Sequence, residues 1–101
     1  MPAVQHMVLV KFKPDVSSEK IAELFDQLAE LPHLISGIKH FAWGPNASPE
    51  GFDHGYTHGF LMTFESRAAR DAYLPHPEHE RVKAAIIPWL DAVVVFDVEE
   101  K

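Results

Sequence analysis

The chain contains no cysteine among its 101 residues. Disulfide bonds, thiolate nucleophiles and cysteine-ligated zinc sites are therefore excluded. Basic residues are also scarce, since nine Lys and Arg side chains stand against 15 Asp and Glu side chains, for a formal net charge of -6. Proteins that bind a nucleic acid backbone cluster Lys and Arg on one surface, so this charge balance disfavours a nucleic acid partner.

Long apolar runs are missing as well. No segment approaches the roughly 20 apolar residues that a membrane-spanning helix needs, so we expect no membrane partner. The amino terminus lacks the basic and then apolar pattern of a secretion signal, which favours a cytoplasmic location. Hydrophobic residues nevertheless make up 47% of the chain, which is enough for a core. Because no linker, repeat or low-complexity segment divides the chain, we predict a single domain over residues 1–101.

What is present is an alternation of strand-like and helix-like segments. Apolar residues recur at every second position in the strand-like segments and at helical spacing in the first helix-like segment. Ser17 or Ser18 can cap that helix, which Pro32 ends, and Pro77 is well placed to begin the last helix. We expect strands over residues 6–13, 38–43, 56–65 and 91–98, and helices from the capping serines to residue 31, over 66–74 and over 77–87.

This order of elements predicts an α+β fold. Strand, helix, strand, strand, helices and strand form a four-stranded antiparallel sheet with helices on one face, the ferredoxin-like plan. The last strand is apolar on both of its faces over Ala92–Phe96, so the uncovered side of the sheet would expose a large apolar patch. A second copy of the chain, packed sheet to sheet, is the simplest cover, and we therefore predict a homodimer.

Tyr73 and His79 are the leading catalytic candidates. They lie on either side of Pro75 and Pro77, and a turn at these prolines would bring a phenol and an imidazole together over the sheet. Histidine exchanges protons near neutral pH, so His79 can serve as a general base while Tyr73 holds a carbonyl or enolate oxygen. The alternative is that Tyr73 packs in the core with a satisfied hydroxyl and that His79 decorates a helix start.

Two further histidines lie in predicted strands. His58 shares a strand face with apolar residues at positions 60, 62 and 64, where it is either a polar anchor of an apolar pocket or a hydrogen-bonded core residue. His6 begins the first strand, so exposure at an edge is the alternative to a role in a pocket. Antiparallel pairing places the starts of neighbouring strands at opposite ends, so His6 and His58 need not lie side by side.

The spacing of His76 and His79 is found among metal ligands. The pair lacks the context of a zinc-binding helix, and Pro77 lies between the two residues, so we predict no metal site. The remaining histidines are expected in loops or on the surface; they are His33, His40 and His54.

Five segments form a combined pattern that is more specific than any one of them: His6–Lys13, Gly55–Phe60, Thr63–Ser66, Ala72–His79 and Val95–Asp97. Together they resemble the stress-responsive dimeric α/β-barrel family, often called Dabb. The resemblance covers almost the whole chain. It implies a ferredoxin-like protomer and a homodimer in which two sheets form a central barrel.

Within this family the sequence is similar to a plant polyketide cyclase, which closes a linear poly-β-keto thioester into an aromatic resorcylic acid. This resemblance implies that Tyr73 and His79 carry the chemistry, with His6 and His58 as supporting residues that contact the substrate. In the plant enzyme, bulky aromatics of the first helix line an alkyl pocket. This chain offers Leu24, Phe25 and Leu28 there, and of these we expect Phe25 and Leu28 to bind a substrate.

Two functions of different classes follow. The first is a dimeric barrel enzyme that binds a small, mostly apolar carbonyl compound between helices and sheet and catalyses proton transfer of the aldol or cyclase type. It needs no metal or cofactor, because a carbon flanked by two carbonyls is already acidic enough for a side-chain base. The second is a non-catalytic stress-response domain that serves as a stable dimer or sequesters a small ligand. The sequence leaves both open.

Overall fold

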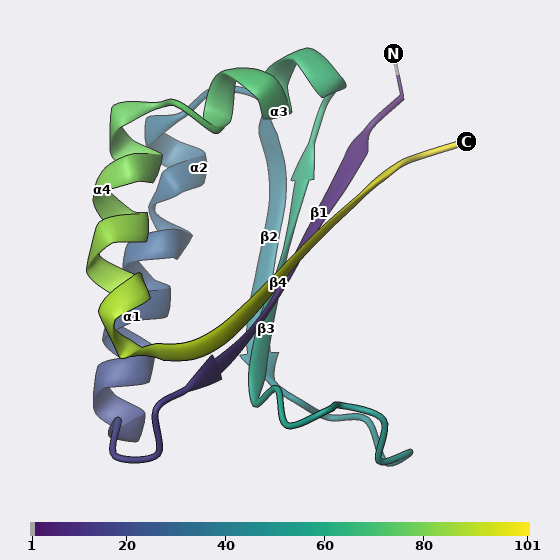
Figure 1. Cartoon of the computed structure of the whole chain (residues 1–101). Helices are drawn as coiled ribbons and strands as arrows, with labels where there is room; N and C mark the ends of the chain where they lie inside the picture. The colour runs from purple at the N-terminus through teal and green to yellow at the C-terminus, as the bar shows by residue number, and fades with distance from the viewer. Residues whose placement is uncertain (1) are drawn as a thin grey trace.

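The computed structural model describes residues 2–101, and they form one antiparallel sheet with a layer of helices (Figure 1). Within these residues the sheet has four strands in the order β2-β3-β1-β4. The strands are β1 (Val4–Phe12), β2 (Ile38–Pro45), β3 (His58–Phe64) and β4 (Leu90–Glu99). The helices are α1 (Ser18–Ala29), α2 (Leu31–Leu34), α3 (Arg67–Tyr73), α4 (Pro77–Ile86) and the short 3-10 helix η1 (Ile87–Trp89). The predicted ferredoxin-like fold is confirmed.

Local chemistry explains where the helices begin. The Ser17 hydroxyl accepts a hydrogen bond from the Lys20 backbone N–H at 3.1 Å, and Ser66 caps α3 in the same way. Such caps satisfy backbone donors that have no partner inside the helix. Helix α4 begins at Pro77, as predicted, and the ring of His76 accepts from the Glu78 backbone N–H. These starts are set by residues that are visible in the sequence.

Most predicted boundaries shift by one or two residues, as in the first strand, which begins at Val4 rather than at residue 6, and two of the shifts have a local cause. The first helix ends at Ala29 rather than at residue 31, and a separate short helix, α2, contains Pro32 in its first turn. Proline is tolerated there because an N–H in the first turn has no acceptor within the helix. The third strand begins at His58 rather than at Tyr56, since the preceding loop continues to Thr57.

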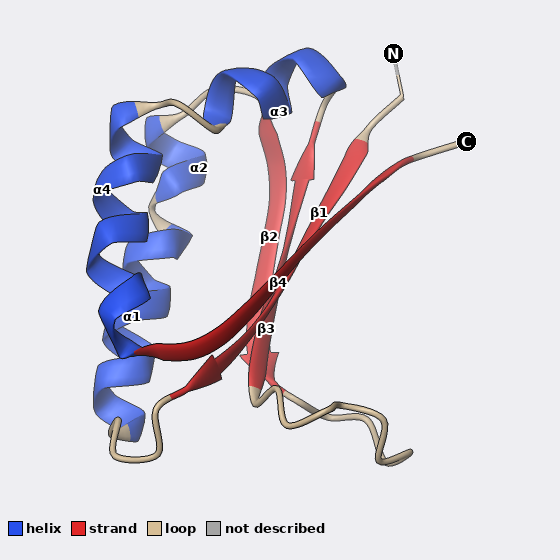
Figure 2. Ribbon diagram, viewed as in Figure 1, coloured by secondary structure: helices blue, strands red, loops and turns tan. Residues whose placement is uncertain are grey.

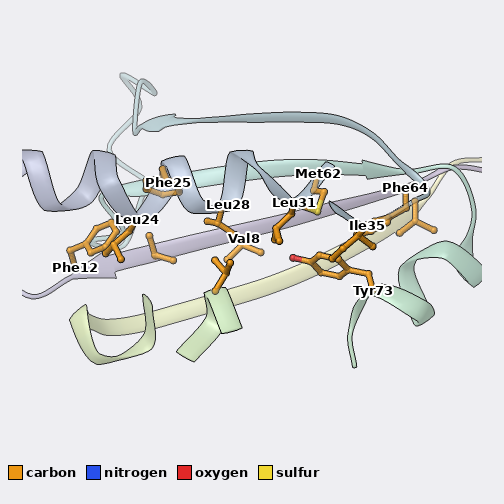
Figure 3. Packing of buried hydrophobic residues seen from close by; sticks show 13 residues of the cluster. Val8, Phe12, Leu24, Phe25, Leu28, Leu31, Ile35, Met62, Phe64 and Tyr73 are labelled. Carbon is orange, nitrogen blue, oxygen red and sulfur yellow. The ribbon is translucent and has the colours of Figure 1, made fainter. Parts of the chain in front are cut away.

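The helices cover one face of the sheet, and the core lies between the two layers (Figures 2 and 3). Alternation along β1 turns every second side chain toward the helices, as expected for a strand with one buried face. The buried apolar residues come from β1, β3, all four α-helices and the residue that follows α2. They are Val4, Val8, Val10, Phe12, Leu24, Phe25, Leu28, Leu31, Ile35, Met62, Phe64, Tyr73 and Val82.

The opposite face of the sheet carries the apolar patch that the sequence predicts. Leu9 of β1 pairs with Val94 of β4, and the next residues on that face are Phe96 and Val98. All four are exposed, Phe96 most of all at 61%. In Figures 1 and 2, α1, α2 and α4 lie together on one side of the sheet, and α3 lies across the end of its strands. None of the helices within residues 2–101 has both the length and the apolarity that crossing a membrane requires.

Candidate active site

A cavity of about 280 Å³ lies between the helical layer and the covered face of the sheet. Its walls are almost entirely hydrocarbon, which is typical of sites for small organic molecules. The predicted substrate-contacting residues Phe25 and Leu28 both line it. The polar residues in the wall are His6, Tyr73, His79 and Lys83. The apolar residues are Val8, Val10, Phe12, Leu24, Phe25, Leu28, Phe60, Leu74, Ile86, Ile87, Leu90, Val93 and Val95.

Tyr73 and His79 meet at one wall of this cavity. Tyr73 is the last residue of α3, and His79 lies in the first turn of α4, so the proline-rich turn between the helices brings them together. Their ring centroids are 4.2 Å apart with an interplanar angle of 35°. Figure 3 shows the Tyr73 hydroxyl directed away from α3 into the interior, on the side of Val8. A phenol and an imidazole thus face the same apolar space.

The surroundings of His79 fix which of its nitrogens can accept a proton. Nδ1 lies 2.9 Å from the carbonyl oxygen of Leu74. A carbonyl oxygen only accepts, so Nδ1 carries the hydrogen of the neutral ring and Nε2 keeps a free lone pair. Burial lowers the pKa of His79, and the positive charge of Lys83 adds to this, while the Leu74 carbonyl and the Glu80 carboxylate oppose it. Burial thus favours the neutral ring of His79, whose Nε2 can accept a proton.

Tyr73 differs from His79 because burial favours the form of its side chain that carries a proton. Its side chain is 1% exposed. Removal from water raises the pKa of the phenol far above its ordinary value. The hydroxyl consequently stays protonated and can donate a hydrogen bond to an oxygen of a guest molecule. A donor that meets developing negative charge in an apolar site is stabilising there.

His6 also lies next to the Tyr73 ring. Its ring is 5.9 Å from the Tyr73 ring, centroid to centroid, in an edge-on arrangement. β1 is an inner strand of the sheet and His6 is 4% exposed, so the alternative of an exposed edge position is wrong. Nδ1 of His6 lies 2.6 Å from Oδ1 of Asp97, the residue directly opposite it on β4. The second Asp97 oxygen accepts from Arg70 of α3.

Sequence reasoning missed Asp97, Arg70 and Lys83. Asp97 could have been found, because an acidic residue within the apolar last strand has to face either solvent or a polar partner. Its partner depends on the pairing register of β1 and β4, which only the folded sheet defines. Arg70 and Lys83 fall on helices whose rotation relative to the sheet has no marker in the sequence.

His58 is not brought to Tyr73 and His79. It pairs with Val10, whereas His6 pairs with Met62, so the two histidines stand toward opposite ends of the same sheet face, as the antiparallel argument predicts. The His58 ring lies edge-on to Phe12 with centroids 5.3 Å apart, and Nδ1 lies 2.9 Å from the Thr57 hydroxyl. Burial lowers its pKa. It lines a second, more open hollow beside the loop over residues 46–57.

The other histidines have local roles or lie on the surface. Nδ1 of His76 accepts from the backbone at the start of α4, and Nδ1 of His79 faces the Leu74 carbonyl. Among residues 2–101, no three or more His, Cys, Asp or Glu side chains gather in a way that could hold a metal ion. The histidines predicted at the surface are exposed; they are His33, His40 and His54.

Comparison with known proteins places this geometry in a family. The model of the stress responsive A/B barrel domain, Dabb, matches residues 4–100. Over 94 residues the chain is 44% identical to the stress-response A/B barrel domain-containing protein HS1 of Arabidopsis thaliana, covering 93% of this chain and 86% of HS1. It is 28% identical over 95 residues to olivetolic acid cyclase of Cannabis sativa, covering 94% of each protein.

A solved structure agrees with these matches in sequence. A dimeric ferredoxin-like protein of unknown function from Jannaschia sp. superposes with a TM-score of 0.86 at 30% identity, over 97% of this chain and 99% of that chain. The order of strands, the one-sided helical layer and a family match over nearly the whole chain lead to the same conclusion. The chain belongs to the family of stress-responsive A/B barrel (Dabb) domains.

Proposed function

We propose that the protein is a homodimeric barrel that binds a small, mostly apolar carbonyl compound in the cavity beside Tyr73 and His79. There it catalyses proton transfer of the aldol or cyclase type without a cofactor. The observation that carries this proposal is the approach of the His79 imidazole to the Tyr73 phenol, with ring centroids 4.2 Å apart, at the wall of an apolar cavity. Similarity to olivetolic acid cyclase supports the reaction class.

The proposed first step removes a proton from a carbon that lies between two carbonyl groups. Nε2 of His79 takes this proton, and the electron pair of the C–H bond moves onto a carbonyl oxygen to form an enolate. The Tyr73 hydroxyl donates a hydrogen bond to that oxygen and stabilises its charge. A positioned general base contributes roughly 10² to 10⁴ in rate.

The second step forms a carbon–carbon bond. The enolate carbon attacks another carbonyl carbon of the same guest, and the π electrons of that carbonyl move onto its oxygen. The imidazolium of His79 then returns its proton to the new alkoxide, which restores the neutral base. A guest with its chain folded against Phe25 and Leu28 would hold the two carbons together, since both residues line the same cavity.

The homodimer is proposed through the uncovered face of the sheet. Leu9, Val94 and Phe96 form an apolar surface there that water would otherwise meet. The Jannaschia protein, at 30% identity, is described as dimeric. Sheet-to-sheet packing of two copies would bury this surface and leave the cavity on the helical side of each protomer.

Exchange of hydrogen for deuterium tests the chemistry without knowledge of the natural substrate. A β-keto ester with one hydrogen between its carbonyls is incubated with the protein in D2O, and NMR follows loss of the C–H signal above the buffer rate. We expect His79→Ala to reduce catalysed exchange by about 10² or more, and Tyr73→Phe to reduce it less.

A matched control is available at His33, an exposed histidine on α2. His33→Ala should leave exchange unchanged, while circular dichroism and dimer mass confirm the fold of every variant. Equal exchange by wild type and both active-site variants would remove the proposed mechanism.

A non-catalytic function is the second candidate. Tyr73 is almost fully buried, with its ring packed against Phe64 at a centroid distance of 4.9 Å, as in an ordinary core residue. Similarity to HS1 agrees with a stress-response domain. This function predicts that carbonyl compounds and phenols raise the melting temperature of the protein although exchange stays at the buffer rate.

A further inference from the structure

The pair of Arg70 and Asp97 connects α3 to β4 beside the candidate active site. A terminal nitrogen of the Arg70 guanidinium donates to Oδ2 of Asp97, and Oδ1 of Asp97 lies 2.6 Å from Nδ1 of His6. We propose that Arg70 and Asp97 are positioning residues that hold Nε2 of His6 as a hydrogen-bond acceptor in the cavity, for an enol or phenol hydroxyl of the guest. The inference rests on the proposed function, because it places the guest in the same cavity.

Asp97 is held from two sides, which leaves its carboxylate one orientation. The pairing register sets it directly opposite His6, and Arg70 engages its other oxygen from the helical layer. Arg70 is itself anchored, since its Nε donates to Asp71 at 2.9 Å. Hydrogen bonds to Asp71 and then Asp97 raise the pKa of Arg70, so its charge is permanent. Without Arg70, the Asp97 carboxylate would lose one of two fixed partners and could rotate.

The orientation of Asp97 determines the tautomer of His6. A carboxylate oxygen accepts from a ring N–H, so in its neutral form the imidazole carries the hydrogen on Nδ1 and keeps a lone pair on Nε2. Within residues 2–101, the side-chain hydrogen bond of His6 goes through Nδ1, which leaves Nε2 for a guest. Three aromatic rings surround this imidazole with centroids at 5.8 to 6.0 Å, and of these only the Tyr73 ring carries a polar atom.

Apart from Lys83, whose ammonium pairs with Glu80 at 3.0 Å, the polar residues of the wall offer one donor and two acceptors. The Tyr73 hydroxyl donates, and Nε2 of both His79 and His6 accepts. A guest that complements all three carries a carbonyl oxygen, an acidic hydrogen and a hydroxyl, as the enol form of a β-dicarbonyl compound or a phenolic ketone does. A guest that lacks the hydroxyl leaves Nε2 of His6 buried without a partner, which weakens its binding.

A second ion pair provides a matched control. Arg67 of α3 contacts Glu99 of β4 at 3.1 Å, so it joins the same two elements as Arg70 and Asp97 do. Its partner has no histidine opposite it, because Glu99 pairs with Val4 in the sheet. Exposed pairs of this kind contribute little to stability. Arg67→Met therefore removes an ion pair between the same two elements without touching a partner of His6.

The first measurement reads the tautomer directly by ¹⁵N NMR of the His6 ring in the full-length protein at pH 8. Wild type and Arg67→Met should show a protonated Nδ1 and an unprotonated Nε2. Arg70→Met should show averaged nitrogen shifts that report a mixture of tautomers. An unchanged pattern in Arg70→Met would overturn the role of Arg70. Asp97→Asn, which keeps the shape of the side chain, should also lose the single tautomer and serves if Arg70→Met does not fold.

The second measurement compares the affinities of the protein for 3-hydroxyacetophenone and 3-methoxyacetophenone by calorimetry, which tests the class of guest. We expect wild type and Arg67→Met to bind the hydroxyl compound about threefold to tenfold more tightly. Arg70→Met should lose this preference and retain its affinity for the methyl ether. Equal binding of the two compounds by wild type, or binding of neither, would overturn the assigned guest class.

The two measurements separate this inference from the proposed function. Neither depends on proton removal by His79. If the tautomer and the hydroxyl preference behave as expected but His79→Ala exchanges deuterium like wild type, the proposed reaction fails and the positioning role remains. The reverse result removes the positioning role alone.

Discussion

The two faces of the sheet differ in what covers them, although the same strands supply both. On β1, His6, Val8 and Val10 are buried beneath the helices, whereas Leu9 between them is 46% exposed. The hydrophobic effect has no preferred direction, so the apolar side chains on both faces of the sheet favour removal from water. The helices cover one face and leave a cavity between themselves and the sheet, whereas the other face is open and could pack against another sheet. The proposed chemistry and the proposed dimer contact thus lie on opposite faces of one sheet.

The strongest way to break this separation is to place a charge on the open face. Phe96→Glu should convert the dimer to a monomer, because an unpaired carboxylate buried between two sheets is strongly destabilising. We expect the dissociation constant of the dimer to rise about a hundredfold or more, as measured by analytical ultracentrifugation.

The same substitution on the helical side is the control. Leu34→Glu changes an exposed leucine of α2, and the dimer should keep its wild-type dissociation constant. A wild-type protein that sediments as a monomer at micromolar concentration would refute the proposed dimer outright.

Removal of one leucine from each side sharpens the comparison. Leu31 is fully buried under the helices, and Leu31→Ala should cost about 2 to 5 kcal/mol of unfolding free energy. Leu9→Ala, on the open face, should cost less than about 1 kcal/mol in a protomer without its partner. Urea unfolding of both variants in the Phe96→Glu background measures the protomer alone. Equal costs would mean that the open face is packed even in the monomer.

A smaller effect should appear when the buried histidines titrate. Burial lowers the pKa of His79 and of His58 below the 6.5 of an exposed histidine, so the unfolded chain binds more protons than the folded one. Their contribution to stability is complete above pH 6.5 and is lost as the pH falls through the lowered pKa values. Urea unfolding between pH 8 and pH 5 should therefore show decreasing stability.

Replacement of one histidine isolates its share of this pH dependence. His79→Gln should flatten the decline, whereas His33→Gln, at an exposed site, should keep the wild-type slope. A steeper decline in His79→Gln would show that the sign assigned to His79 is wrong.

The elements of the fold could be read from the sequence because their signals are local. Ser17, Ser66 and Pro77 set the starts of three helices, and alternation along β1 identifies its buried face. The break at Glu30 between α1 and α2 was missed because proline fits the first turn of a new helix as well as it ends an old one.

The candidate site was accessible only in part. The prolines between Tyr73 and His79 indicate a turn, so their meeting could be anticipated from spacing. The environment of His6 could not be, because burial on an inner strand and an Asp97 carboxylate opposite depend on which strands become neighbours. That neighbour relation joins residues 91 positions apart in the chain.

The sequence by itself determined the order of strands and helices and the apolar stripe of each element. It also placed Tyr73 and His79 on either side of two prolines. These depend on backbone preferences and periodicity within a few residues. Only the tertiary structure decided that His6 rather than His58 joins Tyr73 and His79, and that Arg70 reaches Asp97. Strand register and helix rotation set those contacts, and both emerge from packing of the whole core rather than from any one segment.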